Sequence, residues 1–101
     1  MKSISRIIGF EWDSGNRDKN LTHNVRWNEI EQIFFNKPLL ILQDEKHSGK
    51  ENRSIAYGIT DAKRYLTVIF TIREYRIRAI SARSMHRKER KRYEKEIQKS
   101  A

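Results

Sequence analysis

The residues best suited to chemistry in this sequence are cations near the ends of predicted strands, together with one histidine in a polar segment. His47 lies in that segment, next to Ser48 and close to Arg53. The arginines that end or line the following strands are Arg73, Arg76, Arg78 and Arg83. Guanidinium groups bind phosphate through paired hydrogen bonds, and histidine is the side chain that titrates near neutral pH. The set fits metal-free RNA cleavage, in which a 2′-hydroxyl attacks the adjacent phosphate while arginines stabilise the developing charge and histidine moves protons.

Sequence motifs for other kinds of catalysis are absent. There is no dinucleotide-binding glycine pattern, phosphate-binding P-loop, HExxH motif or EF-hand loop. There is no cysteine, which excludes a disulfide framework and a thiolate metal site. The three histidines are 24 and 39 residues apart, a spacing that matches no zinc motif. We therefore expect no metal and no other cofactor.

The net charge points to a polyanionic partner. The 101 residues carry a formal charge of +9, and residues 51–101 hold 14 of the 22 lysines and arginines. A basic field on a small domain attracts nucleic acid first, although a solubilising surface or an acidic protein partner also accounts for it. The first twelve residues lack the apolar core of a signal peptide, and the longest uncharged apolar run is Pro38 to Leu42. We expect a cytosolic protein without a membrane segment.

Hydrophobic periodicity predicts the elements that must position these residues. Trp27, Ile30, Ile33 and Phe34 form one apolar stripe, which indicates an amphipathic helix ended by Lys37-Pro38. The other predicted elements are an opening strand over Ile7–Trp12, a helix from Asp13 to about Asn20, strands over Leu39–Leu42, Arg53–Thr60, Tyr65–Ile72 and Tyr75–Arg83, and a basic helix over about 86–99. The connections between the strands are short, which favours an antiparallel meander.

These predictions describe one α+β domain over residues 1–101. We expect a compact antiparallel sheet of three to five strands, two N-terminal helices and a C-terminal basic helix. In the last helix Glu89 follows His86 at the spacing of a capping box, and Arg90 is placed to pair with Glu94. Trp12 and Trp27 are expected in the core rather than as base-stacking platforms.

Several short motifs occur in a characteristic order. They are Phe10-Glu11-Trp12-Asp13, Phe34-Phe35-Asn36-Lys37-Pro38-Leu39, Asp44-Glu45-Lys46-His47-Ser48, Gly58-Ile59-Thr60, Phe70-Thr71-Ile72-Arg73 and Ile77-Arg78-Ala79-Ile80-Ser81-Ala82-Arg83. The series resembles the BrnT family, the ribonuclease toxins of type II toxin–antitoxin systems, over about residues 9–95. The FEWD opening, the D-x-x-H-S segment and the IR-x-ISAR strand carry the resemblance together.

The resemblance implies both a fold and a function. It implies a RelE-like fold and a metal-independent endoribonuclease that arrests translation. It also implies neutralisation by a BrnA-type antitoxin, most simply in a complex of two toxins with two antitoxins. Operator DNA would be bound only through the antitoxin. The expected fold agrees with the one drawn from periodicity.

The polar positions of the family fall on Lys19, His47, Arg53, Arg73 and Arg83. As a hypothesis, Arg73 and Arg83 hold the scissile phosphate because they end adjacent strands, and Arg53 assists. His47 would transfer protons, and Lys19 would be a secondary phosphate contact. The other two cations expected to bind RNA are Arg76 and Arg78. The segment from Asn20 to His23 is one residue shorter than the family pattern, so no role is carried over to His23.

Two other functions use the same residues without catalysis. A basic domain of this size can hold RNA or DNA through phosphate contacts alone. A toxin that has lost its activity can persist as a co-repressor subunit. The histidine beside the arginines argues against pure binding, because binding needs no titrating group.

Overall fold

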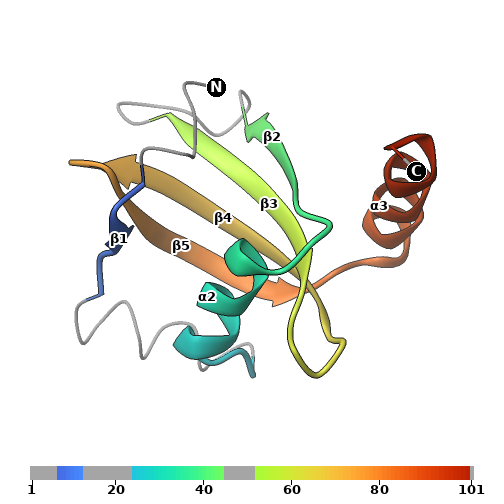
Figure 1. Ribbon diagram of the computed structural model, residues 1–101, viewed down its shortest axis with the longest axis horizontal. Coiled ribbons are helices and arrows are strands. Elements are labelled where there is room, and N and C mark those ends of the chain that lie inside the picture. Colours follow the sequence, from blue (N-terminus) through green and yellow to red (C-terminus); the bar gives the residue numbers. More distant parts are fainter. Residues whose placement is uncertain (1–6, 13–23, 45–51, 101) are drawn as a thin grey trace.

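A five-stranded sheet forms the framework of the molecule (Figure 1). The computed structural model describes residues 7–12, 24–44 and 52–100. The strands are β1 (Gly9–Phe10), β2 (Leu40–Asp44), β3 (Arg53–Ile59), β4 (Tyr65–Arg73) and β5 (Arg76–Ser84). Their order across the sheet is β1-β5-β4-β3-β2. Strands β2 to β5 form the predicted antiparallel meander, and the α+β class is confirmed.

The sheet is mixed, which corrects the expectation of a purely antiparallel one. Strand β1 runs parallel to β5, with the Ile8 amide donating to the Tyr75 carbonyl at 2.8 Å and the Glu11 amide donating to the Ile77 carbonyl at 2.8 Å. Parallel strands need a long connection, and here residues 11–75 lie between the two partners. The helix predicted from Asp13 lies outside the described residues, so the described part has one helix near the N-terminus and one at the C-terminal end.

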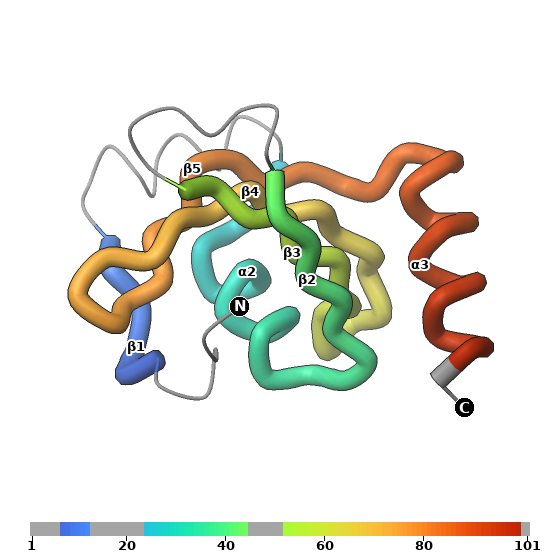
Figure 2. The backbone as a smooth tube through the Cα atoms, turned by 90° about the horizontal axis from the view of Figure 1, so that it is seen from above, coloured from blue at the N-terminus to red at the C-terminus, as the bar shows by residue number. Residues whose placement is uncertain are grey.

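Helix α2 (Trp27–Phe35) covers one face of the sheet (Figure 2). Its stripe is the predicted one, and Ile30 and Ile33 are fully buried. The helix lies so close to β3 that a Cβ atom added at Gly58 would be 2.8 Å from the Cβ of Ile33. The core beneath it contains Val25, Ile30, Ile33, Ala56, Leu66, Val68, Phe70, Ile77, Ala79 and Ala82. A glycine is therefore what lets this helix reach the sheet.

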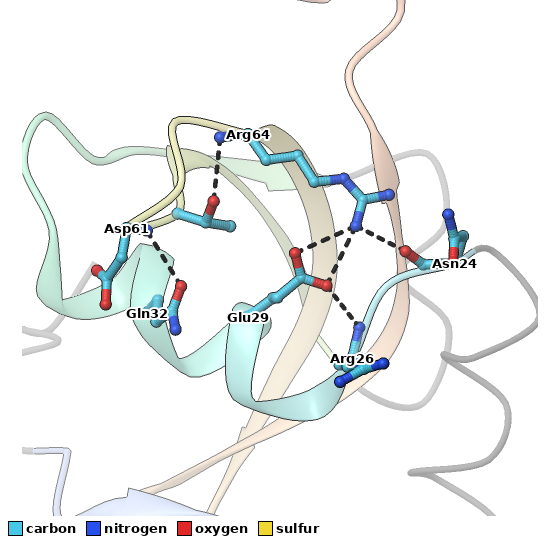
Figure 3. A network of polar contacts seen from close by, with 7 residues as sticks. Asn24, Arg26, Glu29, Gln32, Asp61 and Arg64 are labelled. Atoms are coloured by element: carbon cyan, nitrogen blue, oxygen red, sulfur yellow. Dashed lines mark hydrogen bonds and ion pairs between the residues drawn. The ribbon is translucent and has the colours of Figure 1, made fainter.

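Arg64 fastens the start of α2 to the turn between β3 and β4 (Figure 3). Its guanidinium donates to both carboxylate oxygens of Glu29, at 3.1 and 3.2 Å, and to the carbonyl of Asn24 at 2.6 Å. On the other side of the turn the Asp61 amide donates to the Gln32 side chain at 3.1 Å. Arg64 is thus a structural cation.

Helix α3 (Arg87–Ser100) lies beyond one end of the sheet (Figures 1 and 2). Tyr93 anchors it, because its side chain is fully buried and its hydroxyl donates to the Pro38 carbonyl. The Tyr93 ring meets Tyr65 edge to face at a centroid distance of 5.9 Å, and the Arg90 guanidinium lies 4.0 Å from the centroid of Tyr65. The predicted pair between Arg90 and Glu94 is present at 3.5 Å.

Alternation along the strands separates two faces of the sheet. Leu66, Val68 and Phe70 point toward α2, and all three are buried in the core that the helix shares. The intervening residues of β4 point to the opposite face, here called the far face. The pairing of the strands gives the far face its remaining polar members, and on β3, β4 and β5 these are Arg53, Tyr57, Tyr65, Thr67, Thr71, Arg73, Arg76, Arg78, Ser81 and Arg83.

Candidate functional site

A row of polar residues crosses the far face near one end of the sheet. Thr71 on β4 is the register partner of Arg78 on β5, and Asp44 on β2 is the partner of Arg53 on β3. Arg53 precedes Ser54, the partner of Phe70, and so lies beside Thr71. The Arg78 guanidinium contacts the Glu11 carboxylate at 3.1 Å. Residues in or next to all five strands therefore form one line, in which two arginines flank a threonine and an acid stands at each end. We call it the polar row: Glu11, Arg78, Thr71, Arg53 and Asp44.

An acid stands at each end of the polar row, next to an arginine. Asp44 is only 7% exposed, and a buried carboxylate requires a nearby positive or hydrogen-bonding group. Its register partner on the neighbouring strand is Arg53. Thr71 is also buried, and its hydroxyl donates to the Asn52 carbonyl at 3.0 Å. The row is thus a set of supported side chains rather than loose surface charges.

Two further arginines face each other beyond the row. Arg73 and Arg76 are register partners, one at the end of β4 and one at the start of β5. Arg73 lies two residues after Thr71 on β4, and Arg76 lies two residues before Arg78 on β5. Both are on the same face as the row, about 7 Å from it along their strands. Directly opposed like charges destabilise an antiparallel pair. Two arginine side chains placed in this way can together contact one anion that has several oxygens.

The hairpin turn that joins these arginines has an unusual backbone. Its two residues, Glu74 and Tyr75, both have positive φ angles, 49° and 63°. This pair of values is the φ signature of a type I′ turn, for which Asn-Gly is the favoured sequence. Neither residue here is glycine or asparagine, and both side chains are exposed.

Arg83 lies at the opposite end of the far face, which corrects the idea that it shares a phosphate with Arg73. Both residues end a strand, but antiparallel neighbours end at opposite sides of the sheet. The register partner of Arg83 is Thr67, six residues before Arg73 on β4 and so roughly 20 Å from it. Two side chains at that separation do not hold one phosphate.

At its own end of the face Arg83 forms a bidentate ion pair with Glu89 of α3. The two N–O distances are 2.7 and 2.9 Å. The Thr67 hydroxyl also donates to Glu89 at 3.1 Å, and the His86 amide donates to it at 2.8 Å, as the capping-box spacing predicted. Arg83 is therefore already engaged with an anion that belongs to the protein.

The electrostatics of this end follow from those contacts. Burial alone would raise the pKa of Glu89, but the hydrogen bonds from Arg83, the His86 amide and Thr67 outweigh it and lower the pKa to about 2. The hydrogen bond to Glu89 raises the pKa of Arg83. Burial raises the pKa of the nearby Tyr57 hydroxyl, and the charge of Glu89 adds to that effect. At the end of the far face next to α3, Arg83 and Glu89 thus form an ion pair beside Tyr57, whose hydroxyl stays protonated at neutral pH.

The structure brings together four of the seven predicted site residues. These are Arg53, Arg73, Arg76 and Arg78, which we call the arginine cluster. Arg83 is separated from them, and Lys19 and His47 lie outside the described residues. His47 follows Asp44 by three residues and precedes Arg53 by six in the sequence, so it is close along the chain to one end of the polar row.

Sequence reasoning missed the acids that hold the arginines. Glu11 lies 67 residues before Arg78, and no local spacing predicts that pair. Glu89 lies only six residues after Arg83, but the two belong to different elements, α3 and β5, so no periodicity within one element pairs them. Thr71 could have been found, because alternation along its strand already places a polar residue opposite the apolar stripe.

Neither a metal centre nor a membrane span is visible in the part of the chain that the structure describes. No group of three or more histidine, aspartate or glutamate side chains there is arranged to hold a metal ion. No helix among the described residues is long and apolar enough to cross a membrane.

Comparison with known protein families gives a match over most of the chain. The model of a family described as the ribonuclease toxin BrnT of type II toxin–antitoxin systems matches residues 12–89. That range holds the polar row except Glu11, and it holds the whole arginine cluster. No curated protein matches the sequence.

Proposed function

Because the chain belongs to the BrnT family of ribonuclease toxins of type II toxin–antitoxin systems, we propose that its arginine cluster binds the RNA that it cleaves. The observation that carries this proposal is the direct opposition of Arg73 and Arg76, with Arg53 and Arg78 on the same face two residues away. Opposed guanidinium groups suit an anion with several oxygens, and the phosphodiester of RNA is such an anion.

We infer a metal-independent reaction in which a 2′-hydroxyl of RNA attacks the adjacent phosphate. The attack forms a 2′,3′-cyclic phosphate and releases the 5′-oxygen of the next nucleotide, which takes up a proton. Arg73 and Arg76 would stabilise the charge on the phosphate oxygens, with Arg53 in support. Arg78, held by Glu11, would position the strand of RNA. His47 is the proposed proton-transfer group and Lys19 a secondary phosphate contact.

Arg83 has a different proposed place in this scheme. Because it lies roughly 20 Å from Arg73, any contact that it makes with RNA would be with another part of an extended strand. Its ion pair with Glu89 would first have to open.

The family also implies regulation by a protein partner. We propose a BrnA-type antitoxin that neutralises the toxin in the cytoplasm, in a complex of two copies of each chain. An acidic antitoxin segment would complement the arginine cluster and compete with RNA for it.

A growth experiment with matched arginine variants tests the proposed activity. We expect induction of the wild-type chain in a bacterial host to stop growth and degrade total RNA, with relief by co-expressed antitoxin. Arg73→Gln should lower the rate of RNA cleavage about 100-fold, because one charge stabiliser of the transition state is lost. Arg87→Gln is the control, since Arg87 is an exposed arginine of α3 outside the cluster.

The same proteins test the mechanism in vitro. Cleavage by purified wild-type protein should persist in EDTA, leave 2′,3′-cyclic phosphate ends and fail on RNA whose 2′-hydroxyls are methylated. Loss of cleavage in EDTA, or cleavage of the methylated RNA, would contradict the reaction proposed. If the protein binds RNA without cleaving it, the alternative of a non-catalytic binding module would be supported instead.

A further inference from the structure

Tyr75 differs from the other tyrosines in its exposure. Its side chain is 57% exposed, whereas Tyr57 and Tyr93 are buried and Tyr65 is half-buried against Tyr93. All four tyrosines of the sequence lie in the described part of the chain. Tyr75 is thus the tyrosine whose ring is available to a ligand.

The backbone at Tyr75 does not favour an aromatic residue. Its φ of 63° lies in the left-handed region, where glycine and asparagine are common and bulky residues are outliers. The preceding Glu74, at 49°, has the same disfavoured conformation. A two-residue hairpin turn would form more readily with Asn-Gly. The fold alone therefore does not account for a tyrosine here, and backbone strain of this kind gathers at functional sites.

The charge around Tyr75 indicates what the ring would bind. Arg76 follows it directly, and Arg73 is the strand partner of Arg76, so one hairpin end carries an exposed ring and two arginines. Surfaces that bind single-stranded nucleic acid combine these two features, since cations contact the phosphates while aromatic rings stack on the bases. A single nucleotide carries a phosphate for the arginines and a base for the ring within a few ångströms of each other.

We propose that Tyr75 is a stacking platform for an unpaired nucleobase of the RNA whose phosphates contact Arg73 and Arg76. The proposal rests on the proposed function only in that RNA is the ligand. Every base has a flat face, so the contact adds affinity and favours unpaired RNA without specifying sequence. The Tyr75 carbonyl accepts the Ile8 amide at 2.8 Å, and this backbone contact is independent of the side chain.

Two substitutions separate stacking from the stability of the turn. Tyr75→Asn removes the ring and introduces a residue that the positive φ favours, so the melting temperature should stay the same or rise. Tyr75→Phe keeps the ring and removes the hydroxyl. The probe is a fluorescein-labelled, single-stranded oligouridine with 2′-O-methyl groups, which lacks the hydroxyl needed for cleavage. Fluorescence anisotropy with the full chain gives its dissociation constant over a range of salt concentrations.

We expect Tyr75→Asn to weaken binding about 5- to 150-fold, the effect of losing one stacked base, while Tyr75→Phe changes it less than about 3-fold. The salt dependence should be unchanged in both, because neither alters a charge. An oligomer of the same length with abasic sites should bind the wild type and Tyr75→Asn equally well. Arg76→Gln is the matched control for charge and should reduce both the affinity and the salt dependence.

Equal affinity of the wild type and Tyr75→Asn for oligouridine would overturn the proposal and leave the ring to a protein partner. An equal loss on the abasic oligomer would also overturn it, since the ring would then act without a base. The outcome is separable from the proposed function. If Tyr75→Asn weakens binding but the wild type does not cleave RNA, only the proposed nuclease activity is contradicted. If the wild type cleaves RNA but Tyr75→Asn binds as tightly as the wild type, only the proposed stacking is contradicted.

Discussion

Glu89 accepts several hydrogen bonds where helix α3 meets the sheet. It accepts hydrogen bonds from Arg83, Thr67 and the His86 amide, and it joins α3 to the far face of the sheet. Half of this arrangement is local, because the bond to His86 follows from a three-residue spacing. The other half depends on where β5 places Arg83, which is a property of strand register.

The pKa of Glu89 makes the stability of the protein depend on pH in the acid range. Its folded pKa of about 2 lies below the ordinary value of 4.5, so the stabilisation is complete above about pH 4.5 and is lost as the pH falls toward 2. We expect Glu89→Gln to lower the free energy of unfolding by on the order of 1–2 kcal/mol at pH 7, after allowance for the partial exposure of the pair. Urea denaturation at a series of pH values measures the difference.

Glu94→Gln is the control for that series. Glu94 pairs with Arg90 at 3.5 Å on an exposed helix surface, where such pairs contribute little. The difference in the free energy of unfolding between the wild type and Glu89→Gln should become smaller below pH 4.5. The free energy of unfolding of Glu94→Gln should follow that of the wild type at every pH. A gap that stays constant down to pH 2.5 would show that Glu89 does not hold the low pKa.

At the scale of elements, α2 and β3 pack at the closest approach that the sequence allows. Gly58 faces Ile33, and both the Cβ and the carbonyl oxygen of Ile33 lie where a side chain at residue 58 would begin. The packing distance between α2 and β3 is therefore fixed at this point, and at that distance the apolar side chains of the sheet contact the helix. The Phe34 ring contacts Phe70 edge to face at 5.2 Å in the same layer.

Gly58→Ala is expected to lower the free energy of unfolding by about 1–3 kcal/mol, because α2 must shift to admit a methyl group. The added atom would lie 2.8 Å from the Cβ of Ile33 and 3.2 Å from its carbonyl oxygen. Chemical denaturation should show a lower midpoint with an unchanged slope. Ala62→Ser, which adds one atom at an exposed turn, should leave the midpoint in place. A neutral Gly58→Ala would mean that the helix packs farther from the sheet.

The helices and the four long strands could be predicted from the sequence because their signals are local. The stripe of α2 and the alternation of β4 are periodicities within a few residues. Strand β1 has only two residues, and its parallel partner is fixed by backbone hydrogen bonds that no side-chain pattern encodes. The arginine cluster was predicted as a set of cations, but the distance of Arg83 from it required the register of β4 and β5.

At the scale of the whole molecule, one core connects nearly every element. Helix α2 and strands β3, β4 and β5 all contribute to the same buried cluster, and β1 and β2 pack side chains such as Phe10 and Ile41 against it. The N-terminal strand is bonded to the last strand of the sheet. No described element other than α3 lies apart from this core.

We therefore expect a single cooperative unfolding transition, as for one domain. In a calorimetric experiment the enthalpy measured directly should equal the enthalpy calculated from the temperature dependence of the transition. Tryptophan fluorescence and far-ultraviolet circular dichroism should give the same midpoint. Two separate transitions, or midpoints that differ between the probes, would show that α3 or β1 unfolds independently.

The pairing of β1 with β5 also determines when, during translation, the sheet can be completed. A ribosome releases the chain from its N-terminus, yet Phe10 has no strand partner until Ile77 has been made, and Glu11 has no counter-ion until Arg78 has been made. At about 5–20 residues per second, the first strand waits several seconds for its neighbour. Arg73 and Arg76 are translated within the same short interval. A nascent chain that stops before β5 thus lacks the partner strand of β1 and also lacks Arg76 and Arg78, two of the four arginines of the arginine cluster.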